Sequence, residues 1–140
     1  MRFWSMLFVV CLVLAACTNR DIVTDASVDE SALGEAYGFT MIQVMFDTQS
    51  MKQALVSRYE ETTDQVEATY ENKIDGIFLH GNDAYEKMEE IFGEWEIDAE
   101  MDDTDLLKVV SEAFGVQEYT SLKVQVTFRG YEMKELMLMK

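Results

Sequence analysis

The chain has 140 residues, the length of one domain preceded by a short leader. Apolar residues make up 49% of the sequence and charged residues 27%, which is enough apolar material for a core and excludes disorder along the whole chain. The formal net charge of −16 repels phosphate backbones and so excludes a nucleic-acid-binding protein.

The chain begins with a pattern typical of a signal peptide. Arg2 precedes an apolar run from Phe3 to Ala16 that only Ser5 interrupts. As a helix this run would rise about 21 Å, which is too short to cross the hydrocarbon core of a bilayer. We therefore predict that residues 1–16 are a signal peptide and not a permanent membrane span.

The end of this run resembles a bacterial lipobox. An aliphatic residue and two small residues that a signal peptidase recognises precede the cysteine that takes the lipid: Leu14, Ala15, Ala16 and Cys17. Lipidation of Cys17 with several acyl chains would anchor the protein stably on the extracytoplasmic face of the cell membrane. The alternative is an ordinary secretory signal that ends near a cysteine. The other cysteine, Cys11, lies within the signal peptide, so the mature chain has no disulfide.

The segment after the lipobox is acidic and poor in large apolar residues. We predict that residues 17–37 form a solvated tether, because such a composition buries too little surface to offset its ordering entropy. A first helix over Asp29–Tyr37 is the alternative.

Three strands are predicted next from alternation of apolar and polar residues. They begin near Phe39, near Ala54 and near Gln65, and polar residues separate them. The stretch from Ile74 to Leu79 is apolar enough to form a short strand of its own or to continue the third strand past a kink. The sequence leaves both readings open.

The apolar spacing changes to that of a helix after Gly81. The first helix places its apolar residues on one stripe: Ala84, Met88, Ile91, Phe92 and Trp95. The second does the same before Gly115 ends it: Leu106, Leu107, Val110, Ala113 and Phe114. A clean strand over Leu122–Phe128 follows, Gly130 turns the chain, and a return strand begins at Tyr131. We predict that six of these side chains meet in the core: Phe92, Trp95, Phe114, Val124, Val126 and Phe128.

No motif in the sequence indicates catalysis or a cofactor. His80 is the single histidine, and neither a nucleophile elbow nor a phosphate-binding glycine loop is present. One acidic run invites a cation: Asp98, Glu100, Asp102, Asp103 and Asp105. Its spacing departs from an EF-hand, with Asp103 at the glycine position and Val109 at the position of the bidentate glutamate. We therefore predict no enzyme, no cofactor and no dedicated metal site, with these five acids only as weak candidates for loose cation binding.

Eight methionines lie beyond the signal peptide: Met41, Met45, Met51, Met88, Met101, Met133, Met137 and Met139. Most recur at strand or helix spacing. We therefore predict that they fill the core; an oxidant-sensitive or soft-metal surface is the alternative.

The order of these pieces resembles the YusW-like lipoproteins of Bacillus-type bacteria over about residues 37–138. Four motifs carry the resemblance: Tyr37-Gly38-Phe39, Tyr59-Glu60 to Tyr70-Glu71, Gly81-Asn82-Asp83-Ala84 and Phe128-Arg129-Gly130. Arg129 stands where the family has an aspartate. The resemblance implies a lipoprotein but no activity, because the family is a domain of unknown function.

These observations predict the fold and a functional class. We expect residues 38–140 to form one α+β domain in which an antiparallel sheet of four to five strands carries two consecutive helices on one face, in the order β-β-β-α-α-β-β. The predicted function is a non-catalytic binding or accessory module of the cell envelope, anchored to the membrane and contacting an envelope protein or peptide through the open face or an edge of its sheet. The alternative is an acidic scavenger of divalent cations or cationic peptides.

Overall fold

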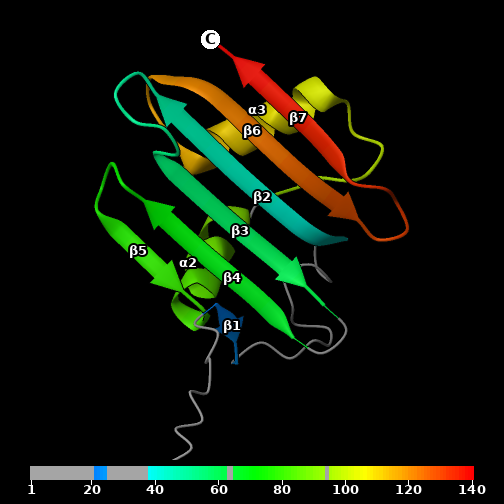
Figure 1. Ribbon diagram of the computed structural model, residues 1–140. Coiled ribbons are helices and arrows are strands. Elements are labelled where there is room, and N and C mark those ends of the chain that lie inside the picture. Colours follow the sequence, from blue (N-terminus) through cyan, green and yellow to red (C-terminus); the bar gives the residue numbers. More distant parts are fainter. Residues whose placement is uncertain (1–20, 25–37, 63–64, 94) are drawn as a thin grey trace, which may run out of the picture.

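The structure is a computed structural model that describes residues 21–24, 38–62, 65–93 and 95–140. The predicted signal peptide, the lipobox and most of the predicted tether lie outside the described residues. The elements in chain order are β1 (Ile22–Val23), β2 (Phe39–Thr48), β3 (Leu55–Glu61), β4 (Val66–Asn72), β5 (Ile77–His80), α2 (Asn82–Phe92), α3 (Asp103–Phe114), β6 (Tyr119–Phe128) and β7 (Lys134–Met139). The described residues thus confirm an α+β fold (Figure 1).

The sheet is larger than the predicted four or five strands. Seven antiparallel strands run in the order β1-β4-β3-β2-β6-β7, and β5 also pairs with β4. The strand β5 settles the open question about the apolar stretch from Ile74, because a turn separates it from β4. The strand β1 was not expected at all.

The strand β1 lies inside the segment predicted to be a solvated tether. Ile22 and Val23 pair with Glu67 and Val66 of β4, and Val23 is 4% exposed. One buried residue in a strand of two cannot produce the alternating pattern from which a strand is predicted. The prediction of a tether that is solvated along its whole length is therefore wrong for these residues.

One side of the sheet carries the apolar core. Ile42, Val44 and Phe46 of β2 are buried between Tyr59 and Leu55 of β3 on one side and the inward residues of β6 on the other. The pairing of β2 with β6 shifts between Phe39 and Met41, so one extra residue enters β2 there. Such a bulge lets Phe39 point inward as well as Ile42, although three positions separate them.

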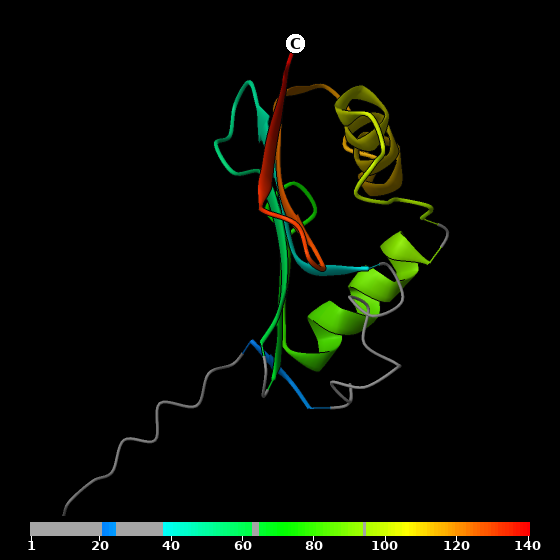
Figure 2. The ribbon, with the colours of Figure 1, turned by 90° about the vertical axis from the view of Figure 1, so that its right-hand side faces the viewer.

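Both helices lie on the same side of the sheet, and the other side carries no helix in the described part of the chain (Figure 2). The helix α2 buries Ala84, Tyr85, Met88 and Phe92, and α3 buries Leu106, Leu107 and Val110. Gly115 ends α3 in the left-handed conformation, with φ of 61°, and its N–H bonds to the carbonyl of Ser111. The helix α2 begins without a side-chain cap, because its N-cap residue is Gly81. The side-chain amide of Asn82, the first residue of the helix, binds Thr24.

The six side chains predicted to form the centre of the core do come together. Five of them are buried, and Phe114 is half-buried. The ring centroids of Phe92 and Trp95 are 4.1 Å apart, and Phe114 lies 6.1 Å from Phe92 and 6.2 Å from Trp95. These rings join the end of α2 to the end of α3 above the sheet.

The methionines do not fill the core as predicted. Met88 alone among the eight is buried, and Met101 packs against the core from a half-buried position. Met133, Met137 and Met139 are exposed. The alternation along the strands was read correctly, but the face that carries Met41, Met45, Met137 and Met139 has no covering layer in the described residues.

Candidate functional site

We call the side of the sheet away from the helices the open face. Antiparallel pairing brings six of its residues into one row across the sheet: Phe78 (β5), Glu71 (β4), Val56 (β3), Met45 (β2), Lys123 (β6) and Met137 (β7). Four of the six are apolar, and we call these six residues the central row. Solvated faces of antiparallel sheets are ordinarily polar, so this row departs from the usual pattern.

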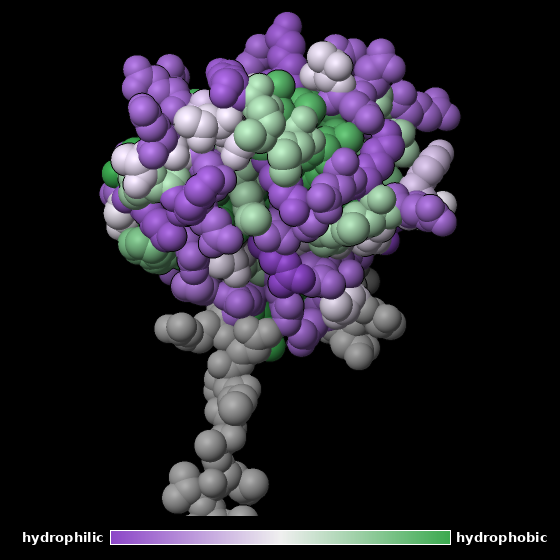
Figure 3. All heavy atoms as spheres, turned by 45° about the horizontal axis from the view of Figure 1, so that its top comes forward, coloured by the Kyte–Doolittle hydropathy of each residue, from purple (hydrophilic) through white to green (hydrophobic). Residues whose placement is uncertain are grey.

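The ends of the central row are the most accessible. Phe78 is 55% exposed and Met137 is 56% exposed, while Val56 and Met45 between them are half-buried by their neighbours. Met139, two residues after Met137 on the same face of β7, is 67% exposed. Figure 3 shows apolar residues gathered within an otherwise mainly hydrophilic surface. The open face therefore presents apolar side chains at the centre and at both ends of the central row, with Glu71 and Lys123 between them.

A polar row borders the central row. It runs across the same six strands: His80, Thr69, Arg58, Gln43, Gln125 and Glu135. Glu135 accepts a hydrogen bond of 2.8 Å from the Gln125 amide and lies 3.4 Å from the Lys123 ammonium. The hydrogen bond first, and Lys123 second, hold the pKa of Glu135 below its usual value. Arg58 forms an ion pair with Glu60.

Neither Phe78 nor Met137 was predicted from the sequence to be a contact residue. The alternation of the strands did indicate that both side chains face outward, because each follows or precedes an inward-facing residue of its strand. These inward-facing residues are Leu79 in β5 and Leu136 in β7. What the sequence could not supply was the strand order and register that place these two residues at the ends of one row.

Asp47 lies near the end of β2, at the border of the open face. Its carboxylate accepts a 2.7 Å hydrogen bond from the Gln53 N–H and a 3.2 Å bond from the Ser121 hydroxyl, and the Lys52 ammonium lies 3.6 Å away. The Gln53 hydrogen bond is the main cause of a lowered pKa at Asp47; burial opposes it. Gln53 has a φ of 49°, so Asp47 also holds a turn residue in a left-handed conformation.

This environment predicts how acid affects stability. Because the folded-state pKa of Asp47 is lower than its unfolded value, the stabilisation by the carboxylate is complete above the unfolded-state pKa and is lost as pH falls through the folded-state pKa. We expect Asp47→Asn to cost up to about 1 kcal/mol at neutral pH and to lose that difference in acid. Urea unfolding of both proteins across pH measures this; a constant difference at all pH values would contradict it.

His80 has a structural contact. Its Nδ1 lies 2.6 Å from the Asp21 carboxylate, and the backbone carbonyl of Asp21 accepts the Ala68 N–H at 2.7 Å. The neighbouring pair, Asn82 and Thr24, exchanges two further hydrogen bonds of 2.7 and 2.9 Å. These contacts fasten residues 21–24 to the sheet edge and explain how so short a strand as β1 is held.

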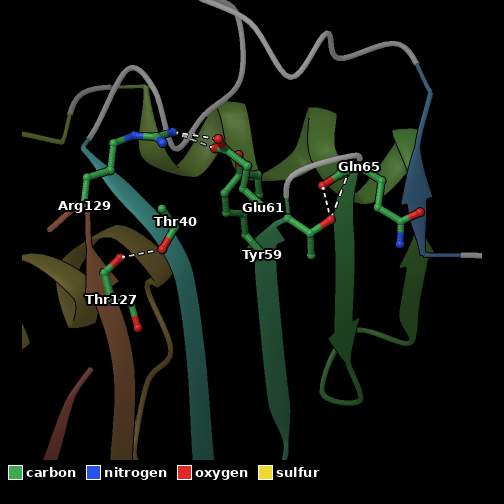
Figure 4. Close-up of polar contacts among 7 residues, drawn as sticks. Thr40, Tyr59, Glu61, Gln65, Thr127 and Arg129 are labelled. Atoms are coloured by element: carbon green, nitrogen blue, oxygen red, sulfur yellow. Dashed lines mark hydrogen bonds and ion pairs between the residues drawn. The ribbon is translucent and has the colours of Figure 1, made fainter. Parts of the chain in front are cut away.

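Arg129, which directly follows β6, forms an ion pair with Glu61 at the end of β3 (Figure 4). Its guanidinium donates to both carboxylate oxygens of Glu61, at 2.7 and 2.9 Å, and the Glu61 side chain is 7% exposed. The Tyr59 hydroxyl contacts the same carboxylate at 3.2 Å. A buried carboxylate requires such a partner, so Arg129 has a structural role here.

The predicted lipid and signal-peptidase residues, Leu14 to Cys17, lie outside the described residues. The weak cation candidates are described and do not converge. Asp98 accepts the Glu100 N–H at 2.9 Å, Asp103 lies 3.4 Å from the Lys134 ammonium, and Asp102 precedes α3. Within the described ranges, no group of three or more His, Cys, Asp or Glu side chains could hold a metal ion.

We therefore expect calcium and magnesium to act alike on this protein. Millimolar amounts of either should raise the melting temperature slightly and about equally, by relieving carboxylate repulsion as sodium chloride also does. A specific site would instead respond to one ion at a concentration where the other has no effect. Thermal melts in each salt test this. A large saturable shift with micromolar calcium alone, abolished by Asp102→Asn, would contradict it.

None of the described helices is long and apolar enough to cross a membrane. The sequence profile of the YusW-like protein family matches residues 43–130, from within β2 to the turn after β6. No curated protein and no solved structure matches the chain. The matched region contains both helices and most of the open face. The chain belongs to the YusW-like protein family.

Proposed function

We propose that this protein is a non-catalytic binding module of the cell envelope that contacts its partner through the open face of the sheet. The observation that carries the proposal is the central row, with Phe78 and Met137 exposed at its ends. Exposing these side chains costs solvation free energy that a bound partner would recover. Methionine suits such a surface, because its unbranched side chain adapts to the shape of a partner.

The edge strand β7 extends this surface. It ends the hydrogen-bonded order of the sheet, and among the described residues no strand pairs with its outer side. Met137 and Met139 lie on it. An extended peptide could add to this edge through main-chain hydrogen bonds and at the same time cover the neighbouring methionines.

The proposal includes a lipid anchor on Cys17, on the extracytoplasmic face of the cell membrane. Only four positions separate Cys17 from Asp21, which is fastened to His80. Four residues span at most about 14 Å when extended. The anchored domain would therefore sit close to the bilayer at its β1 edge, nearer than a long free tether would allow.

Capture experiments at a series of salt concentrations test whether the open face is the contact surface. The full chain is immobilised and exposed to detergent-solubilised envelope proteins, and the bound fraction is compared with that of a Phe78→Ser/Met137→Ser double variant. A Tyr131→Ser/Met133→Ser variant is the matched control, since both residues are exposed but lie outside the central row. We expect a component that wild type and control retain at high salt and that the double variant loses.

Two results would contradict the proposal. Equal capture by the double variant and wild type would exclude the open face as the contact surface. Loss of capture from wild type as salt rises would indicate the alternative function, an acidic scavenger of divalent cations or cationic peptides, because charge-driven binding is screened and apolar contact is not.

A further inference from the structure

A groove of about 840 Å³ lies between the two helices, on the side of the molecule away from the open face. Residues of α2, of α3 and of the segment between them line it. Six of them form its apolar floor and its acidic rim: Ile91, Trp95, Glu96, Val109, Glu112 and Ala113. The groove is therefore a surface separate from the central row.

The floor of the groove is apolar and firmly held. Ile91, Val109 and Ala113 are half-buried and pack against the core, so each still presents part of its surface. Trp95 is 7% exposed, and its ring lies against Phe92 and Phe114. An apolar side chain placed here would meet a preformed surface.

The rim of the groove is acidic. The ammonium of Lys87 lies 3.4 Å from Glu90, so the basic residue at the rim is already paired. Glu96 and Glu112 are exposed, and no ion pair in the described part of the chain involves either. Two uncompensated carboxylates thus flank an apolar floor.

The Trp95 indole adds an independent sign of a missing contact. Its Nε1 is buried and has no hydrogen-bond partner among the residues that the structure describes. Buried N–H groups in native proteins are nearly always paired, because an unpaired donor loses its hydration without compensation.

Charge identifies the kind of occupant. Residues 25–37 of this chain carry four acidic residues and no basic one, so their charge has the wrong sign for this rim. A second copy of the chain brings a net charge of −16 and is repelled as well. The geometry points to a cationic amphipathic peptide whose apolar face lies on Ile91, Val109 and Trp95 and whose basic side chains pair with Glu96 and Glu112.

Intrinsic fluorescence tests this binding directly. The chain has two tryptophans, so in the full chain with Trp4→Phe the signal comes from Trp95 alone. The probe is a leucine-lysine peptide with its leucines on one helical face, and the control peptide has glutamate in place of lysine. We expect a saturable change in Trp95 fluorescence with the lysine peptide and none with the glutamate peptide.

Charge variants then locate the site. Glu96→Gln/Glu112→Gln should raise the Kd for the lysine peptide roughly tenfold, as expected for the loss of two ion pairs. Glu118→Gln/Glu132→Gln changes the net charge equally at exposed residues outside the groove lining and should leave the Kd within about twofold of wild type. Equal weakening by the two variants would overturn the proposal, because it would indicate nonspecific attraction to the net charge. A saturable signal with the glutamate peptide, or no signal with the lysine peptide, would also overturn it. These fluorescence results leave the proposal for the open face unaffected, because the capture experiment tests that surface separately.

Discussion

Phe128→Ala should lower the free energy of unfolding by about 3 to 5 kcal/mol, the range for removing a buried phenylalanine side chain. Phe128 is 3% exposed at the end of β6 and stands opposite Phe39, which is fully buried. Phe39 in turn contacts the rings of Tyr59 and Phe92 edge-on, at 5.7 and 6.1 Å between centroids. Truncation at 128 would therefore leave a void beside a packed aromatic cluster that joins the sheet to α2.

Urea unfolding measures this loss, and the neighbouring position supplies the control. Thr127 is half-buried on the open face, so Thr127→Ala should change the free energy of unfolding by no more than about 0.5 kcal/mol. If Phe128→Ala shifted the midpoint as little as Thr127→Ala does, the inward face of β6 would have been assigned to the wrong side.

Cys17→Ser should abolish lipid incorporation almost completely. In the proposed lipoprotein the thiol of Cys17 is the group that would take the lipid, and a serine hydroxyl offers no thiol for that bond. The variant should then be released or held only by its uncleaved signal peptide. Metabolic labelling with a fatty acid measures the incorporation.

Cys11 provides a matched control, since it lies in the apolar run that precedes the predicted lipobox. Cys11→Ser should incorporate lipid as the wild type does. Equal incorporation in Cys17→Ser and wild type would remove the lipoprotein assignment, whereas the binding surfaces of the folded domain would be unaffected.

The sequence predicted best those elements whose two faces have contrasting environments. Leu122, Val124 and Val126 of β6 are fully buried, while the residues between them face solvent, so the period-two pattern was unambiguous. The helices were predicted for the same reason. Their apolar stripes face the sheet and their charged residues face water.

The predictions failed where the outcome depends on partners distant in sequence. The strand β1 exists because Asp21 reaches His80 and Thr24 reaches Asn82, each about 58 positions away, and no local pattern encodes those contacts. Met41, Met45 and Met137 were predicted to be core residues because they are apolar and recur at strand spacing. Whether a sheet face is covered is decided by where the helices pack, which the spacing within a strand does not specify.

The acidic run depends on contacts of a different kind. Among the described residues, Asp98, Glu100 and Asp102 belong to no group of three or more side chains that could hold a metal ion, so the prediction of loose cation binding still rests on their spacing. The groove between the helices was not foreseen. Glu96 and Glu112 are 16 positions apart in sequence, and the packing of the end of α3 against the end of α2 places them on one rim.

Site-specific photo-cross-linking in intact cells tests the central claim, that the open face is the contact surface of a membrane-anchored binding module. A photoreactive residue replaces Arg58, which is exposed in the polar row beside Val56, or Lys73, which is exposed in the turn between β4 and β5. The account predicts a cross-link to one envelope component from position 58 and none from position 73. Cross-links of equal yield from both positions, or from position 73 alone, would contradict it.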